Sequence, residues 1–183
     1  DVICDSEPLN TLAVLAPDTR FVSTFGNKLH NTTITGRVSY DQMKPLVEHA
    51  GIYLCTAKET FGIGTLEALA AGVPVLGWAW GGQVDIIKHK ETGYLARPGD
   101  YQDLLEGLQY CQKYRDRMSQ AARQDAIDRY QWKDIVGQYA QLFHQLGKAR
   151  TGPKVSVIVT CYKLEEYLPD CLKSLQEQTM KNW

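Results

Sequence analysis

The stretch that decides the fold is Glu59-Thr-Phe-Gly-Ile-Gly-Thr-Leu-Glu-Ala-Leu-Ala-Ala-Gly-Val-Pro74. An apolar run typical of a strand, Ile52–Cys55, precedes it, and its second half has the composition of a helix that Gly72 and Pro74 bring to an end. The stretch therefore predicts a strand, a loop with two glycines and a helix. In a parallel sheet, such a loop lies beyond the carboxyl end of its strand, where α/β proteins bind ligands.

On both sides of this stretch, short β-rich apolar runs alternate with helical patterns. This alternation predicts an α/β fold with a Rossmann-like parallel sheet and helices on both faces. We expect strands at 21–24, 32–35, 52–55, 75–77 and 94–96, and helices at 8–15, 40–50, 65–71 and 84–88. Apolar residues then recur at helical spacing from Leu104 to Leu146, behind Asp100 as a helix cap, which predicts a C-terminal run of helices.

The domain organisation follows from changes in composition near residue 150. We predict a first domain at residues 1–147, a polar linker with glycine and proline at 148–154, and the start of a second domain at 155–183. The run Val155–Thr160 is apolar and β-branched, as in a strand buried on both faces, and a helical pattern follows it. Since the chain starts without Met and stops after this isolated strand–helix unit, we expect it to be a piece of a longer protein.

Composition excludes several classes of function. The net charge of −1 gives no basic field, which argues against a nucleic-acid partner. No apolar run approaches the roughly 18 residues of a membrane span. The five cysteines are scattered and the four histidines lie far apart, so we expect no metal site. These features predict a reduced, cytoplasmic protein.

Two glycines and two glutamates give the loop its chemistry. Gly62 and Gly64 lack Cβ atoms, so that a ligand can approach the backbone closely. The start of the following helix offers free N–H groups and a positive dipole end, which suit a diphosphate. Glu59 and Glu67 can face one pocket and accept hydrogen bonds from hydroxyls of an extended ligand. The alternative is that both are ordinary solvated carboxylates.

A dinucleotide-binding loop of the form Gly-x-Gly-x-x-Gly is the competing interpretation. Here Glu67 stands where the third glycine would allow close helix packing, and the loop follows a later strand rather than opening the fold. We therefore reject it. Trp78 and Trp80 could line a sugar pocket, but packing is the favoured interpretation for both.

The same stretch resembles the Glu-x7-Glu motif of the group 1 retaining glycosyltransferases, in the C-terminal, nucleotide-sugar-binding half of the GT-B fold. Further motifs follow in the family's order over about residues 32–146. They are Thr35-Gly36-Arg37-Val38, Gly81-Gly82, Thr92-Gly93-Tyr94-Leu95, Pro98-Gly99-Asp100 and Tyr130-Gln131-Trp132.

The resemblance implies a role for each matching residue. Glu59 would be the catalytic-site residue that meets hydroxyls of the donor sugar, and Glu67 would hold the ribose hydroxyls. Arg37 and Val38 would lie near the base. The remaining donor-binding residues implied in this way are Phe61, Gly62, Ile63, Gly64, Thr65, Gly81 and Gly82.

Two regions depart from the family patterns or extend them. The family has a basic pair in its first strand–helix loop, where this chain has Asp5 and Glu7, which would weaken diphosphate binding. Residues 155–183 resemble the start of a group 2, GT-A-type glycosyltransferase. That likeness implies nucleoside contacts for Thr160, Tyr162 and Glu165.

The function implied is transfer of a glycosyl group, with retention, from a nucleotide-diphosphate sugar to a glycan or lipid-linked glycan acceptor. We expect no cofactor or metal, a role in surface polysaccharide or glycoconjugate synthesis, and peripheral membrane association at the inner face through the parent protein. The chain alone should be inactive, because the acceptor-binding domain is missing. The alternatives are a non-catalytic donor-binding or scaffolding domain and, less favoured, a sugar-nucleotide epimerase.

Overall fold

The computed structural model describes residues 6–148, together with 173 and 177. The chain forms two compact units, residues 1–131 and 132–183, which are described separately. Apart from residues 173 and 177, the predicted second domain lies outside the described residues, and so do Thr160, Tyr162, Glu165 and Asp5.

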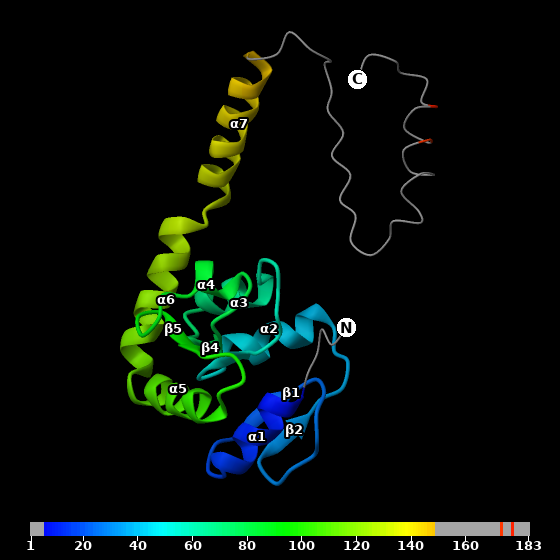
Figure 1. The fold of residues 1–183 in the computed structure, drawn as a ribbon, viewed down its shortest axis with the longest axis vertical. Helices are drawn as coiled ribbons and strands as arrows, with labels where there is room; N and C mark the ends of the chain where they lie inside the picture. The colour runs from blue at the N-terminus through cyan, green and yellow to red at the C-terminus, as the bar shows by residue number, and fades with distance from the viewer. Residues whose placement is uncertain (1–5, 149–172, 174–176, 178–183) are drawn as a thin grey trace. The chain divides into compact units, whose positions relative to one another are not determined.

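Short parallel strands form the sheets of the first unit (Figure 1). β1 (Phe21–Ser23) pairs with β2 (Thr32–Ile34), and β4 (Val75–Trp78) lies between β3 (Tyr53–Cys55) and β5 (Gly93–Ala96). All pairs are parallel, so the predicted strand positions and direction are confirmed. The expected single sheet is instead two sheets, of two and three strands, since no pairing joins β2 to β3 within residues 6–148.

Helices connect and follow these strands. In the first unit they are α1 (Glu7–Leu15), α2 (Tyr40–Glu48), α3 (Ile63–Ala70), α4 (Gln83–Ile86), α5 (Tyr101–Lys113) and α6 (Arg115–Arg129). The Asp100 carboxylate accepts a hydrogen bond from the Asp103 N–H at 3.0 Å, and this confirms Asp100 as the cap of α5. α2 begins at a capping box formed by Ser39 and Gln42.

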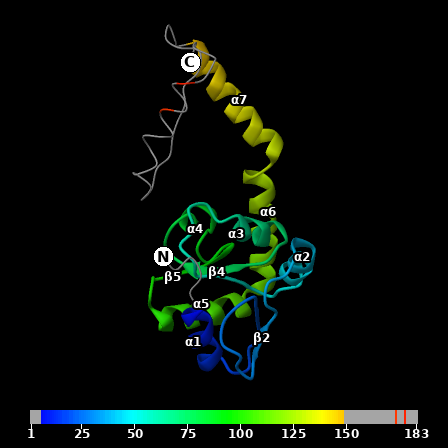
Figure 2. The same cartoon turned by 90° about the vertical axis from the view of Figure 1, so that its right-hand side faces the viewer.

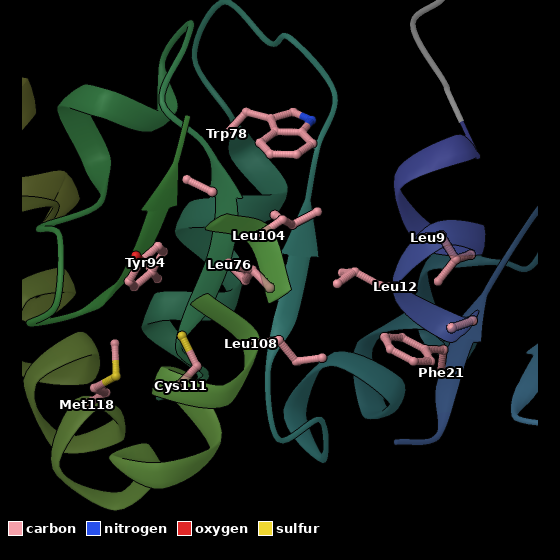
Figure 3. Packing of buried hydrophobic residues seen from close by; sticks show 12 residues of the cluster. Leu9, Leu12, Phe21, Leu76, Trp78, Tyr94, Leu104, Leu108, Cys111 and Met118 are labelled. Carbon is pink, nitrogen blue, oxygen red and sulfur yellow. The ribbon is translucent and has the colours of Figure 1, made fainter. Parts of the chain in front are cut away.

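Alternate residues of the central strands pack against helices on opposite faces. Leu76, Trp78 and Tyr94 point toward α1 and α5, where Leu12, Leu104 and Leu108 meet them (Figure 3). On the other face, Val75 and Cys55 pack with residues of α3, α4 and α6. Figure 2 shows α3 and α4 on one side of β4 and β5, and α1 and α5 on the other. The predicted covering of both faces is therefore confirmed, and Trp78 is a core residue rather than part of a sugar pocket.

The second unit contains α7 (Trp132–Lys148), which completes the predicted run of helices. Its apolar residues recur at helical spacing, and the rings of Tyr139 and Phe143, one turn apart, lie 6.0 Å from each other. Within the described part of the chain, no helix is both long and apolar enough to cross a bilayer.

The role of β4 as the centre of the core can be tested at Leu76, which is 1% exposed. Leu76→Ala should lower the free energy of unfolding by about 2–5 kcal/mol, because it removes buried methyl groups and leaves a cavity between α1 and α5. Urea denaturation followed by circular dichroism measures the loss. The matched control is Leu15→Ala, since Leu15 is 44% exposed and its truncation should cost less than about 1 kcal/mol. Equal losses in the two variants would contradict the described core.

Candidate functional site

The candidate site lies at the carboxyl ends of β3 and β4. The segment 56–62 follows β3 and leads into α3, and the segment 79–82 follows β4 and leads into α4. Because neighbouring parallel strands end at the same edge of the sheet, these two segments meet there. The glycine-bearing loop is thus where the sequence places it.

α3 begins without any side-chain cap. Gly62, directly before the helix, has φ 100° and ψ 60°, a left-handed conformation that an L side chain rarely adopts. No side chain within the described structure caps α3, and no acidic residue stands in its first turn. The first-turn N–H groups and the positive end of the helix dipole therefore lack a negatively charged partner from the protein's own side chains.

The two loop segments are in close backbone contact. The Gly82 N–H donates to the Glu59 carbonyl oxygen at 2.8 Å. A Cβ atom on Gly81 would overlap that same carbonyl oxygen, and one on Gly82 would overlap the carbonyl oxygen of Phe61. The glycine pair therefore packs directly against the backbone of residues 59–61. The motif alone did not reveal this role.

The side chains of Glu59 and Glu67 are both exposed, and both lie near the phenol of Tyr53. Burial raises the pKa of Tyr53 to about 12, and the charges of Cys55, Glu59 and Glu67 add to the effect. The Tyr53 hydroxyl also lies under α3, where a Cβ atom on Gly64 would be only 2.6 Å from it. The charges of both glutamates thus act on the same phenol, although burial has the larger effect on its pKa.

A hollow of about 260 Å³ adjoins Glu67 on the outer face of α3. Its wall is mainly apolar and comes from α3 and α6, whereas Glu59 does not contribute to it. The other lining residues are Ile63, Leu66, Ala70, Ala126, Ile127, Tyr130 and Gln131.

The other predicted residues differ in what they can offer a ligand. Phe61 and Ile63 are 51% and 66% exposed, whereas Thr65 is 1% exposed, so that Thr65 can contribute only through its backbone. Arg37 and Val38 lie between β2 and α2. No hydrogen bond or ion pair within the described residues joins them to the segment 59–67.

Two further residues contact the loop: Gln83, which the sequence did not single out, and Trp80, for which packing was the favoured interpretation. The Gln83 amide donates to the Ala57 carbonyl oxygen at 2.5 Å, and the Trp80 indole N–H donates to the same oxygen at 3.3 Å. The sequence signal for Gln83 is a polar residue at the start of the predicted short helix beside the glycine pair. Across the described residues, no group of three or more His, Cys, Asp or Glu side chains is placed to hold a metal ion.

Solved structures similar to this one share its fold. Sucrose-phosphate synthase from Thermosynechococcus elongatus aligns with a TM-score of 0.59 and 25% identity, over 66% of this chain and 31% of that protein. HepE from Anabaena, solved in complex with UDP and glucose, aligns with a TM-score of 0.61 and 20% identity, over 75% of this chain and 44% of that one. The fold is that of one half of a GT-B glycosyltransferase.

The sequence identifies the family. The model of the glycosyl transferases group 1 matches residues 26–125, more than half of the chain, which therefore belongs to this family. The N-acetyl-alpha-D-glucosaminyl L-malate synthase of Bacillus anthracis is 34% identical over 98 residues, or 51% of this chain. The chain spans about a quarter of the length of that relative.

The close contact at Gly82 predicts a penalty for the smallest possible side chain. Gly82 has φ −65°, which alanine adopts without strain, so Gly82→Ala adds only a methyl group against the Phe61 and Thr60 carbonyls. We expect a loss of about 1–3 kcal/mol in the free energy of unfolding, measured by urea denaturation. Gly51→Ala is the control, because its Cβ would meet nothing nearer than 3.7 Å. If both variants are equally stable, the two segments are not in contact.

The effect of both glutamate charges on the Tyr53 phenol predicts that removing either charge lowers the pKa of Tyr53. Glu59→Gln and Glu67→Gln should each lower the pKa of Tyr53 from about 12, as followed by NMR of the tyrosine ring carbons. Since this pKa lies above the ordinary value of 10.0, the stability that the buried neutral phenol contributes is full below pH 10 and is lost as the pH rises toward 12. Glu106→Gln is the control and should lower the pKa of Tyr94 instead. If neither substitution changes the pKa of Tyr53, the two glutamates do not act on its phenol.

Proposed function

We propose that this chain is the donor-binding half of a retaining glycosyltransferase that uses a nucleotide-diphosphate sugar. The observation that carries the proposal is the uncapped start of α3 behind the left-handed Gly62, with Glu59 before it and Glu67 after it. An exposed helix start without an acidic residue suits a diphosphate. Two flanking carboxylates suit the hydroxyl-bearing groups at either end of that diphosphate.

In the proposed complex, the diphosphate lies over the backbone of Phe61–Gly64. Glu67 accepts hydrogen bonds from the ribose hydroxyls, and Glu59 accepts them from hydroxyls of the donor sugar. During transfer the bond from the anomeric carbon to the diphosphate oxygen breaks, and the leaving diphosphate takes the electron pair. The oxygen of an acceptor hydroxyl forms the new bond to the anomeric carbon on the same face, and its proton passes to the leaving diphosphate. The N–H groups at the start of α3 stabilise the charge that develops there, so that the chain acts by positioning and electrostatics and uses no bound metal.

The comparisons support a ligand of this class. HepE, which shares the fold, was solved with UDP and glucose. Family membership over residues 26–125 includes the whole segment from Glu59 to Gly82. Arg37 and Val38 also fall within the matched range, and we assign them to the neighbourhood of the base.

We further propose that the remainder of the longer protein supplies the acceptor site. The chain covers about a quarter of its Bacillus relative. A glycan or lipid-linked glycan acceptor would bind to the missing part, at the cytoplasmic face of a membrane, in the synthesis of a surface polysaccharide or glycoconjugate. A scaffolding domain that binds no donor is the competing possibility, and Glu7 at the start of α1 favours it, because acid replaces base there.

Binding of a nucleoside diphosphate tests the proposal. Titration calorimetry of the chain with UDP, and then with GDP, should show binding of one of them. Glu67→Gln should weaken that binding by about 1.5–3 kcal/mol, the scale of hydrogen bonds to a charged group. Glu106→Gln, an equal change of charge on α5, should leave the affinity unchanged. Failure of the unaltered chain to bind either nucleotide would favour the scaffolding function.

A further inference from the structure

Gln83 is a polar residue with no exposed surface, located where α4 begins. Its amide nitrogen donates to the Ala57 carbonyl oxygen at 2.5 Å and to the Cys55 sulfur at 3.2 Å. Its amide oxygen, which is also buried, has no hydrogen-bond partner in the described structure. The unpaired amide oxygen costs stability, and an apolar side chain at this position would not carry that cost. Stability alone would therefore not select a glutamine here.

The bonds from Gln83 converge on the segment that carries Glu59. Ala57 lies two residues before Glu59, and its carbonyl oxygen also accepts the indole N–H of Trp80 at 3.3 Å. The carbonyl oxygen of Glu59 itself accepts the N–H of Gly82 at 2.8 Å. Residues 80–83, which follow β4, thus donate hydrogen bonds to the carbonyl oxygens of Ala57 and Glu59 after β3. The bond from Gln83 is the shortest of them.

The same side chain also reaches the helix that carries Glu67. Thr65, which is 1% exposed in the first turn of α3, lies beside the Cys55 thiol. Burial raises the pKa of this thiol, and the polar side chains of Thr65 and Gln83 beside it partly oppose the rise. Residues from β3, α3 and α4 therefore meet at one buried sulfur beneath the glycine loop.

We propose that Gln83 is a positioning residue, which fixes the backbone of residues 57–59 and thereby the direction of the Glu59 side chain. Its importance for donor binding rests on the proposed function. Gln83 does not touch the ligand in this arrangement, because it is fully buried. It acts through its hydrogen bond to Ala57. Ala57 follows β3, whose end is already held by pairing with β4.

The test replaces Gln83 with a residue of similar length that cannot donate a hydrogen bond. In Gln83→Met, NMR-detected hydrogen exchange should be at least about tenfold faster at the Gly82 amide and the Trp80 indole N–H, because the segments separate more often. Thr92→Val is the matched control. Thr92 is also 0% exposed, and its hydroxyl accepts the Lys88 N–H at 3.0 Å, without a bond to the Glu59 segment. Trp80→Phe removes only the second donor to Ala57 and serves as an independent variant if Gln83→Met does not fold.

Each outcome decides the proposal. Faster exchange confined to these two groups in Gln83→Met, or at the Gly82 amide in Trp80→Phe, supports a positioning role, together with weaker binding of a UDP-sugar such as UDP-glucose at unchanged affinity for UDP. Exchange equal to that of the unaltered chain overturns it, as does acceleration that is spread over the domain and shared with Thr92→Val. If exchange changes locally while the unaltered chain binds neither UDP nor GDP, the positioning role stands and the proposed donor site fails.

Discussion

The close approach of Gly81 and Gly82 to the carbonyl oxygens of Glu59 and Phe61 is the constraint on which the site depends. β4 is buried along its whole length, so the segment that follows it emerges at a fixed place beside the end of β3. From there the Gly82 N–H reaches the Glu59 carbonyl. Any larger residue in the glycine pair would move the loop away. Packing of the sheet thus determines where the backbone before α3 runs.

The arrangement of elements was predictable because its signals are local. The glycine and proline after α3, the cap at Asp100 and the uninterrupted apolar run of β4 each mark a boundary or a buried face within a few residues. The division into two sheets was not predictable, because pairing between β1 or β2 and β3 depends on contacts between segments distant in sequence. For the same reason, the sequence could not show how Arg37 stands relative to Glu59.

The predicted site residues stay a prediction, and the structure adds to what the sequence said about the surroundings of each one. Spacing placed Glu59 and Glu67 on either side of a glycine loop, and the structure brings both near Tyr53. Spacing could not show that Thr65 is buried, or that the glycine pair packs against the backbone of residues 59–61. The sequence did not indicate a role for Gln83, because a glutamine beside two glycines is typical of an exposed turn. Only the tertiary structure reveals that it is fully buried.

Several features that cost stability coincide at this one edge of the sheet. α3 begins without a side-chain cap, Gly62 is left-handed, and the buried oxygens of Gln83 and Thr65 have no hydrogen-bond partner within the described residues. Elsewhere in the domain, α2 has a capping box and α5 an aspartate cap, whereas α1 and α6 also begin without a side-chain cap. The buried Asn31 amide oxygen likewise has no hydrogen-bond partner within the described residues. Sequences under selection for stability alone remove such costs, and natural proteins retain them mainly at functional sites. What distinguishes the edge beside Glu59 and Glu67 is that a left-handed glycine, an uncapped helix start and the unpaired Gln83 oxygen occur within one pair of adjoining loops. This observation rests on hydrogen bonding and backbone geometry, and it is independent of the motif.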